Sequence, residues 1–279
     1  MLEVTHLPGL RTRVRQNVKD VEVDNVIDIV VIGIGGIFIN VLIGRFYGAG
    51  TLGIFSQVMT IYVLFSQLAT GGIHFSVQKH VPEYSNNLYE CVRIISSAFI
   101  LTSVVASIVC LLLYASTDWI GAALDSPDVS FGLVLVIPGL FFYALNKILL
   151  LSLNGLRHMR LYAVVQTLRV LVYLAGVAAI TILDVPSKFI PVVFTLAEIL
   201  LVLILVPYFY WILPFRTELN LNNWYMRHVK FARKAFVSGF LADVNPRIDI
   251  LVLGFFTTDA VVGIYSFASM IAEGVAQIP

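Results

Sequence analysis

Residues 189–213 read FIPVVFTLAEILLVLILVPYFYWIL, a run in which Glu198 is the one charged side chain. A helix of this length rises by about 37 Å at 1.5 Å per residue, which exceeds the roughly 30 Å hydrocarbon core of a bilayer. The run therefore predicts a membrane-spanning helix. Similar runs recur along the chain, so this one stretch sets the expectation for the whole fold.

The composition points the same way. Of the 279 residues, 59% are hydrophobic and 13% are charged, with a mean hydropathy of +0.91, whereas a soluble domain has roughly 25% charged residues. The formal net charge is +1, and the basic residues are scattered between apolar runs, which argues against a nucleic-acid partner. We expect an all-α integral membrane protein that contacts membrane lipid.

We predict about eight spans, at 26–45, 52–73, 91–115, 130–153, 161–183, 189–213, 235–256 and 260–279. The connections are short and carry turn residues, such as Gly48-Ala-Gly50 and Ser126-Pro127-Asp128. These spans divide the chain into an amphipathic N-terminal segment at the cytoplasmic surface (1–24), a six-helix N-lobe (25–213), a cytoplasmic interlobe linker (214–234) and the start of a C-lobe (235–279).

The orientation follows from the Lys and Arg residues outside the spans. If the N-terminus is cytoplasmic, nearly all of these residues fall on the cytoplasmic side, while the outer connections hold Arg45 and Lys188. This asymmetry is typical of multi-pass proteins of the cell membrane. It predicts a cytoplasmic N-terminus, an outer connection over 116–128 and an even number of spans in the N-lobe.

An internal repeat relates the two ends of the chain. Shifting the sequence by 210 residues aligns 37–61 with 247–271, and the shift places Gly53 on Gly263 and Ser56 on Ser266. Six spans separate the two copies, so both copies cross the membrane in the same direction, which predicts parallel lobes. The last apolar run stops at Pro279, so we expect the second lobe to be truncated after two helices.

Three stretches carry a resemblance to a known family: LIGRFYGAGTLGIF at 42–55, LNGLRHMRLY at 153–162, and Arg247-Ile-Asp249 followed by Gly263-Ile-Tyr265. They resemble the polysaccharide-unit flippases, the Wzx-type, oligosaccharidyl-lipid branch of the multidrug/oligosaccharidyl-lipid/polysaccharide exporter (MOP) superfamily. The resemblance implies a MATE-like fold of two six-helix lobes, of which this chain lacks helices nine to twelve. It also implies alternating access to a cavity that receives a polyprenyl-(pyro)phosphate-linked oligosaccharide.

Charged side chains inside spans are costly and are therefore candidate functional residues. Arg247, Arg169 and Lys147 are candidates for holding the substrate phosphate, because an anion that crosses the membrane requires cations at that depth. Asp243 lies four residues before Arg247 and would share one face of a continuous helix with it. For that pair, a structural ion pair and a phosphate site remain equally open.

Four acids are candidates for coupling or for charge pairing: Asp243, Asp249, Glu198 and Glu273. Glu198 is either a proton or sodium site or the partner that neutralises Arg169, and we favour the pairing. Pro246 is expected to bend the seventh span beside Arg247, because proline removes a backbone donor.

No catalytic triad, metal-ligand spacing or Walker-type motif is present in the sequence. We therefore expect a transporter with no cofactor and no bound metal, coupled to H⁺ or Na⁺. Three alternatives remain open, namely a MATE-type drug or cation exporter, a membrane glycan polymerase or ligase, and a scaffold that transports nothing. Buried bases favour an anionic cargo over the first alternative, and the short outer connections disfavour the second.

Overall fold

The computed structural model describes the backbone of residues 8–215 and 222–276, and the side chains of 33–215, 223–242, 244–272 and 274. This part of the chain consists of nine α-helices, one 3₁₀ turn and no strands, as the composition predicts. The elements are α1 (Pro8–Thr70), α2 (Ile73–Glu83), α3 (Leu88–Ala123), α4 (Pro127–Gly155), α5 (Met159–Ile182), η1 (Ser187–Phe189), α6 (Val192–Ile212), α7 (Asn222–Val244), α8 (Ile248–Phe256) and α9 (Asp259–Ala276).

Five helical segments in the described chain are long and apolar enough to cross a membrane: Gly33–Thr70, Leu88–Ala123, Pro127–Gly155, Met159–Ile182 and Ser187–Ile212. They make the protein a multi-pass membrane protein, in agreement with the sequence. Large apolar side chains such as Leu111, Leu112 and Leu203 are exposed on α3 and α6, as expected for helices that face lipid.

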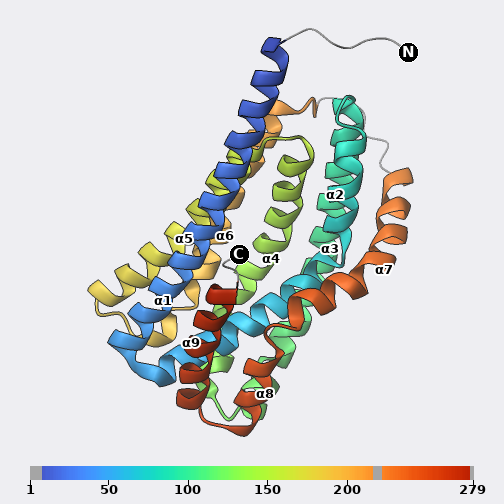
Figure 1. Cartoon of the computed structure of the whole chain (residues 1–279). Coiled ribbons are helices and arrows are strands. Elements are labelled where there is room, and N and C mark those ends of the chain that lie inside the picture. Colours follow the sequence, from blue (N-terminus) through green and yellow to red (C-terminus); the bar gives the residue numbers. More distant parts are fainter. Residues whose placement is uncertain (1–7, 216–221, 277–279) are drawn as a thin grey trace.

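The first predicted turn is confirmed at Gly48, where α1 changes direction sharply (Figure 1). Gly48 has φ 84° and ψ 173°, a region of backbone space that is essentially restricted to glycine. The first two predicted spans are therefore the two halves of α1, joined without a loop. Gly71 and Gly72, with φ 53° and 75°, then separate α1 from α2.

Two of the predicted boundaries are wrong. The stretch 116–128 is not a loop, because α3 continues to Ala123 and the chain reverses over Leu124–Ser126 before Pro127 starts α4. The seventh span, 235–256, is not one continuous helix. It is interrupted at Asn245-Pro246-Arg247, between α7 and α8, because proline lacks the amide donor and disfavours a helical conformation in the residue before it.

Two clusters of buried apolar side chains hold the bundle together. The first includes Ile43, Val58 and Leu133, and joins α1 to α4. The second includes Ile95 and Leu201, and joins α3 to α6. Small residues allow the helices to approach closely. For example, the backbone amide of Gly139 on α4 donates to Thr195 Oγ1 on α6 at 3.0 Å, a packing typical of membrane helices.

The connections of the bundle lie at two ends. Figure 1 shows the start of α1, the α2–α3 connection and the start of α7 at one end, and the Gly48 turn, the α3–α4 turn and the α8–α9 turn at the other. The predicted orientation would make the second group extracytoplasmic. This arrangement brings α9 onto α1, and α7 onto α2 and α3.

Candidate functional site

Glu198 lies at the centre of a buried polar network between α4, α5 and α6. Its side chain is fully buried, and its carboxylate oxygens contact the Arg169 guanidinium at 2.9 Å (Nε to Oε1) and 3.2 Å (Nη2 to Oε2). The Tyr173 hydroxyl donates to the same carboxylate at 3.1 Å, and Asn146 Nδ2 donates at 2.8 Å. The negative charge of Glu198 is therefore neutralised and fully hydrogen-bonded within the protein.

Arg169 has further contacts, although its buried Nε has no hydrogen-bond partner within the described residues. Beyond its pair with Glu198, Nη1 donates to Gln166 Oε1 at 2.7 Å, and the guanidinium lies over the Tyr143 ring at 5.3 Å. Its side chain is 12% exposed. The pairing of Glu198 with Arg169, which the sequence favours, is present in the structure.

Lys147 lies on the wall of the bundle formed by α4 and the second half of α1. Its ammonium group donates to Gln67 Oε1 at 3.1 Å, and the contact is partly buried. The partner in this contact is a neutral amide. The role of Lys147 as a cation for a passing anion stays a prediction.

Arg247 is the N-cap of α8 and directly follows Pro246. Its backbone amide donates to Val244 O at 3.0 Å, and its half-buried side chain forms no ion pair within the described side chains. The prediction that Asp243 and Arg247 share one continuous helix is wrong, because α7 ends between them at Val244. The side chains of Asp243 and Glu273 lie outside the described residues, and so does any pair that they form.

Asp249 is held by α9 and by its own helix. The Tyr265 hydroxyl donates to Asp249 Oδ2 at 2.5 Å, and the amide of Ile250 donates to Oδ1 at 2.9 Å. The carboxylate therefore links α8 to α9. The three predicted cations Arg169, Lys147 and Arg247 thus lie in three different settings: an ion pair, an amide contact and a helix N-cap.

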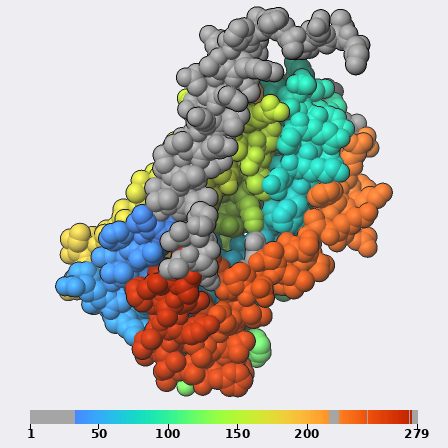
Figure 2. Space-filling model, in the orientation of Figure 1, coloured from blue at the N-terminus to red at the C-terminus, as the bar shows by residue number. Residues whose placement is uncertain are grey.

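The contact between α1 and α9 is formed mainly by small and uncharged residues. Ser56 Oγ lies 2.8 Å from Ser266 Oγ, and both residues are buried. A methyl group added at Gly53 would overlap the carbonyl oxygen of Asp259, and one added at Gly263 would overlap that of Ala49. Figure 2 shows the red atoms of α9 directly against the blue atoms of α1.

These contacts are reciprocal under the sequence repeat. Residues 49, 53 and 56 correspond to residues 259, 263 and 266 after the shift of 210, so each glycine meets the equivalent backbone of the other copy. Asp259 adds a polar clamp, since its carboxylate accepts from Gln57 Nε2 at 2.6 Å and from Ser126 Oγ at 2.8 Å. The repeat signal in the sequence identifies these residues, but not their contact.

Comparison with known proteins places the chain in a family. Residues 24–278 match the family described as polysaccharide biosynthesis protein. The chain belongs to this family. The resemblance noted from the Gly-rich and Arg-containing stretches of the sequence is therefore confirmed over almost the whole length. None of the curated proteins is similar enough to this chain to be matched.

A solved structure, "protein A", has the fold of this polysaccharide biosynthesis protein. The TM-score is 0.68 at 13% sequence identity, and the similarity covers 92% of this chain and 60% of that chain. At this identity the similarity concerns the fold alone. The chain thus spans 60% of the length of the solved chain that it matches.

The family description connects this multi-pass membrane protein with polysaccharide biosynthesis.

Proposed function

We propose that this protein moves a polyprenyl-(pyro)phosphate-linked oligosaccharide across the cytoplasmic membrane by alternating access, as part of polysaccharide or glycan export. In this proposal the N-terminus is cytoplasmic, residues 25–213 form one MATE-like lobe, and residues 235–279 begin a second lobe in parallel orientation. The two predicted spans within α1, together with α7 to α9, bring the proposed number of membrane crossings to about eight.

The observation that carries the proposal is the reciprocal contact of α1 with α9. Alternating access requires two halves that touch at one end of the membrane in one state and separate there in another. Contacts between glycine backbones and serine hydroxyls suit this requirement, because they allow close approach while each hydrogen bond between membrane helices contributes only about 0.6 kcal/mol. We assign the contact to the extracytoplasmic gate of an inward-facing state.

The charged residues receive separate roles in the proposal. Arg247 and Lys147 hold the substrate phosphate: the half-buried Arg247 forms no ion pair among the described residues, and the ammonium group of Lys147 contacts the neutral amide of Gln67. Arg169 acts through its ion pair with Glu198, which keeps α5 and α6 together. The acids Asp243, Asp249 and Glu273 lie on the moving helices α7 to α9 and are the candidates for coupling to H⁺ or Na⁺.

A reversible cross-link across the gate tests the proposal. Ser56→Cys and Ser266→Cys are introduced together after the native cysteines are removed as Cys91→Ala and Cys110→Ala. The two hydroxyls are 2.8 Å apart, so the cysteines can form a disulfide. The protein is reconstituted in liposomes with a fluorescent polyprenyl-diphosphate oligosaccharide. A membrane-impermeant quencher on one side of the liposomes detects the fluorescent lipid on that side, so transport protects the lipid from quenching. Oxidation of the cysteine pair should stop this transport, and a reductant should restore it.

The matched control places a disulfide at the same end of the bundle without bridging α1 and α9. Asp118 and Ser130 lie on α3 and α4 with 3.2 Å between Oδ1 and Oγ, so Asp118→Cys with Ser130→Cys should leave transport unchanged when oxidised. Full transport by the oxidised gate variant would refute alternating access at this contact. Export of an organic cation, without movement of the oligosaccharide, would favour the drug exporter instead.

A further inference from the structure

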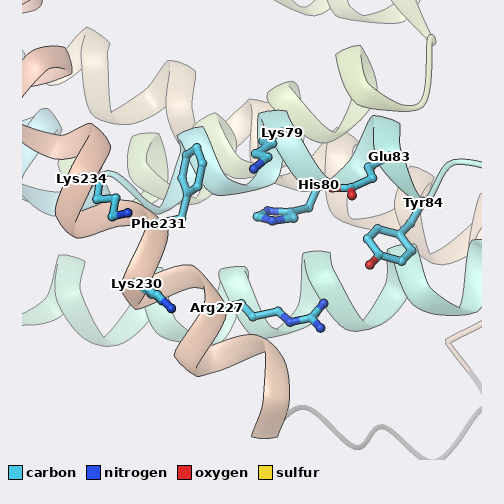
Figure 3. A pocket seen from close by; sticks show the side chains of 8 residues that line it. All are labelled: Lys79, His80, Glu83, Tyr84, Arg227, Lys230, Phe231 and Lys234. Carbon is cyan, nitrogen blue, oxygen red and sulfur yellow. The ribbon is translucent and has the colours of Figure 1, made fainter.

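A basic groove lies between α2 and the first half of α7 (Figure 3). It encloses about 320 Å³ and is lined by four cations, Lys79, Arg227, Lys230 and Lys234, and one acid, Glu83. Figure 3 shows Lys79 on α2 and Lys230 on α7 extending toward the space between the two helices. The predicted orientation places this groove on the cytoplasmic side.

The groove is held open by a rigid contact behind it. Trp224 is buried, and its indole Nε1 donates to Glu90 Oε1 at 2.7 Å. His228 is fully buried between Ser76 on α2, 2.9 Å from Nδ1, and Ser97 on α3, 3.1 Å from Nε2. These partners fix the rotation of α7, so that Arg227, Lys230 and Lys234 face the same space.

The four cations are available to an anion. Within the part of the chain that the structure describes, none of them forms an ion pair. Lys79 Nζ lies over the Phe231 ring at 5.2 Å, and Arg227 lies over the Trp224 ring at 4.8 Å. These contacts orient the positive groups but leave their N–H donors unused. Like charges converging on one space repel each other, and an anion would relieve that repulsion.

The position of the groove along α7 indicates a ligand at the membrane surface. Lys230 and Lys234 lie one turn apart, and beyond them Val237 and Leu241 are exposed on the same helix. The helix therefore changes from charged to apolar where a lipid headgroup would meet its acyl chain. A lipid with a phosphate headgroup satisfies both parts of this surface at once.

We propose that the basic groove binds the diphosphate headgroup of a polyprenyl-linked lipid in the cytoplasmic leaflet, and so loads the substrate before it passes between the lobes. This assignment rests on the proposed function. A diphosphate is favoured over the single phosphate of a common phospholipid, because the groove carries four positive charges against the one acid, Glu83. The planar guanidinium of Arg227 and the ammonium groups of the lysines can then bind both phosphates.

Binding is measured without transport, on the purified protein in nanodiscs, with three probes. These are an unglycosylated polyprenyl diphosphate, phosphatidylglycerol and inorganic pyrophosphate. The test variant is Lys230→Gln with Lys234→Gln, and the matched control is Arg233→Gln, an exposed cation on the same helix that does not line the groove. We expect the test variant to weaken polyprenyl diphosphate binding about tenfold or more, given the usual strength of hydrogen bonds to charged groups, and the control to bind within about twofold of the unmodified protein.

Three outcomes would overturn the assignment. If Arg233→Gln weakened polyprenyl diphosphate binding as much as the test variant, the binding would depend on the general positive charge of the surface and not on the groove. Equal affinity for phosphatidylglycerol would make the groove a site for any anionic lipid, and equal affinity for inorganic pyrophosphate would make it a site for the free anion. None of these measurements uses transport. The binding assay can therefore refute the groove while the gate cross-link still blocks transport, and the cross-link can refute the gate while the groove still binds the lipid.

Discussion

The hydroxyl oxygens of Ser56 and Ser266 lie 2.8 Å apart, although 210 residues separate them in the chain. The same separation relates Gly53 to Gly263, and each of these glycines faces the backbone of the other copy. A pair of equivalent residues can touch in this way only if the two copies are related by rotation about an axis that passes near the contact. The internal repeat of this polysaccharide biosynthesis protein thus meets itself at one end of the bundle.

The reciprocity of this contact gives the first prediction. Gly53→Ala and Gly263→Ala should have similar effects, because each added methyl group overlaps the carbonyl oxygen at the equivalent position, Asp259 or Ala49. Both should force α1 and α9 apart and reduce oligosaccharide transport, with little change in the melting temperature of the bundle. Gly50→Ala is the control, since a Cβ at Gly50 meets nothing within 4 Å. A large effect of one substitution alone would contradict the symmetric contact.

The ion pair of Arg169 with Glu198 gives the second prediction. Glu198→Gln leaves a buried guanidinium without its counter-charge, which should destabilise the protein by about 3–5 kcal/mol, as for other buried ion pairs that lose one partner. Replacing both residues, as Arg169→Met with Glu198→Leu, should recover most of that loss. Thermal unfolding in detergent measures both effects. If the double variant is stable yet inactive, Arg169 contributes to transport beyond its structural pairing.

A third prediction concerns Arg247, which follows the break between α7 and α8. Arg247→Ala should abolish movement of the lipid-linked oligosaccharide while the protein stays folded, because the half-buried side chain forms no ion pair among the described residues. Asn245→Ala, in the same turn and exposed, should transport normally. Normal transport by Arg247→Ala, measured in the same liposomes, would reject the phosphate-binding role.

The docking of α7 should depend on pH through His228. Burial lowers the pKa of His228 from the ordinary value of 6.5 to about 4, although the hydrogen bond to the Ile94 carbonyl opposes the shift. Between about pH 4 and pH 6.5, His228 binds a proton more readily when α7 is undocked than when α7 is docked. The contribution of His228 to the docking of α7 is therefore complete above about pH 6.5 and decreases as the pH falls toward about 4.

Hydrogen exchange measures this docking directly. Amides of 223–234 should exchange faster at pH 5 than at pH 7, after correction for the intrinsic rate. His228→Asn keeps a polar partner for Ser76 and Ser97 but cannot be protonated, so its exchange should no longer depend on pH in this way. The control His80→Asn removes a half-buried histidine whose charge is the smallest of the influences on the pKa of His228, so the dependence should be retained with at most a small shift. An unchanged response in His228→Asn would refute the role of His228.

Parts of the fold could be predicted because they depend on local chemistry. The apolar runs predict membrane helices, and the turn at Gly48 follows from a conformation that other residues avoid. The pairing of Glu198 with Arg169 could be favoured because a lone charge in the membrane is costly. The helix ends could not be placed as well. For α3, the predicted end at residue 115 follows the hydrophobic pattern, whereas the helix continues to Ala123 because backbone hydrogen bonding does not stop where hydropathy changes.

By itself, the sequence determined that this protein is a helical membrane bundle of the polysaccharide biosynthesis family, and that its first and last helix pairs repeat each other. Only the tertiary structure decided that Ser56 meets Ser266, that Asp259 is clamped by Gln57 and Ser126, and that Lys79 faces the cations of α7. The reason is physical. Hydropathy and turn preferences act on neighbours in the chain, whereas these contacts depend on how helices far apart in sequence are rotated and packed.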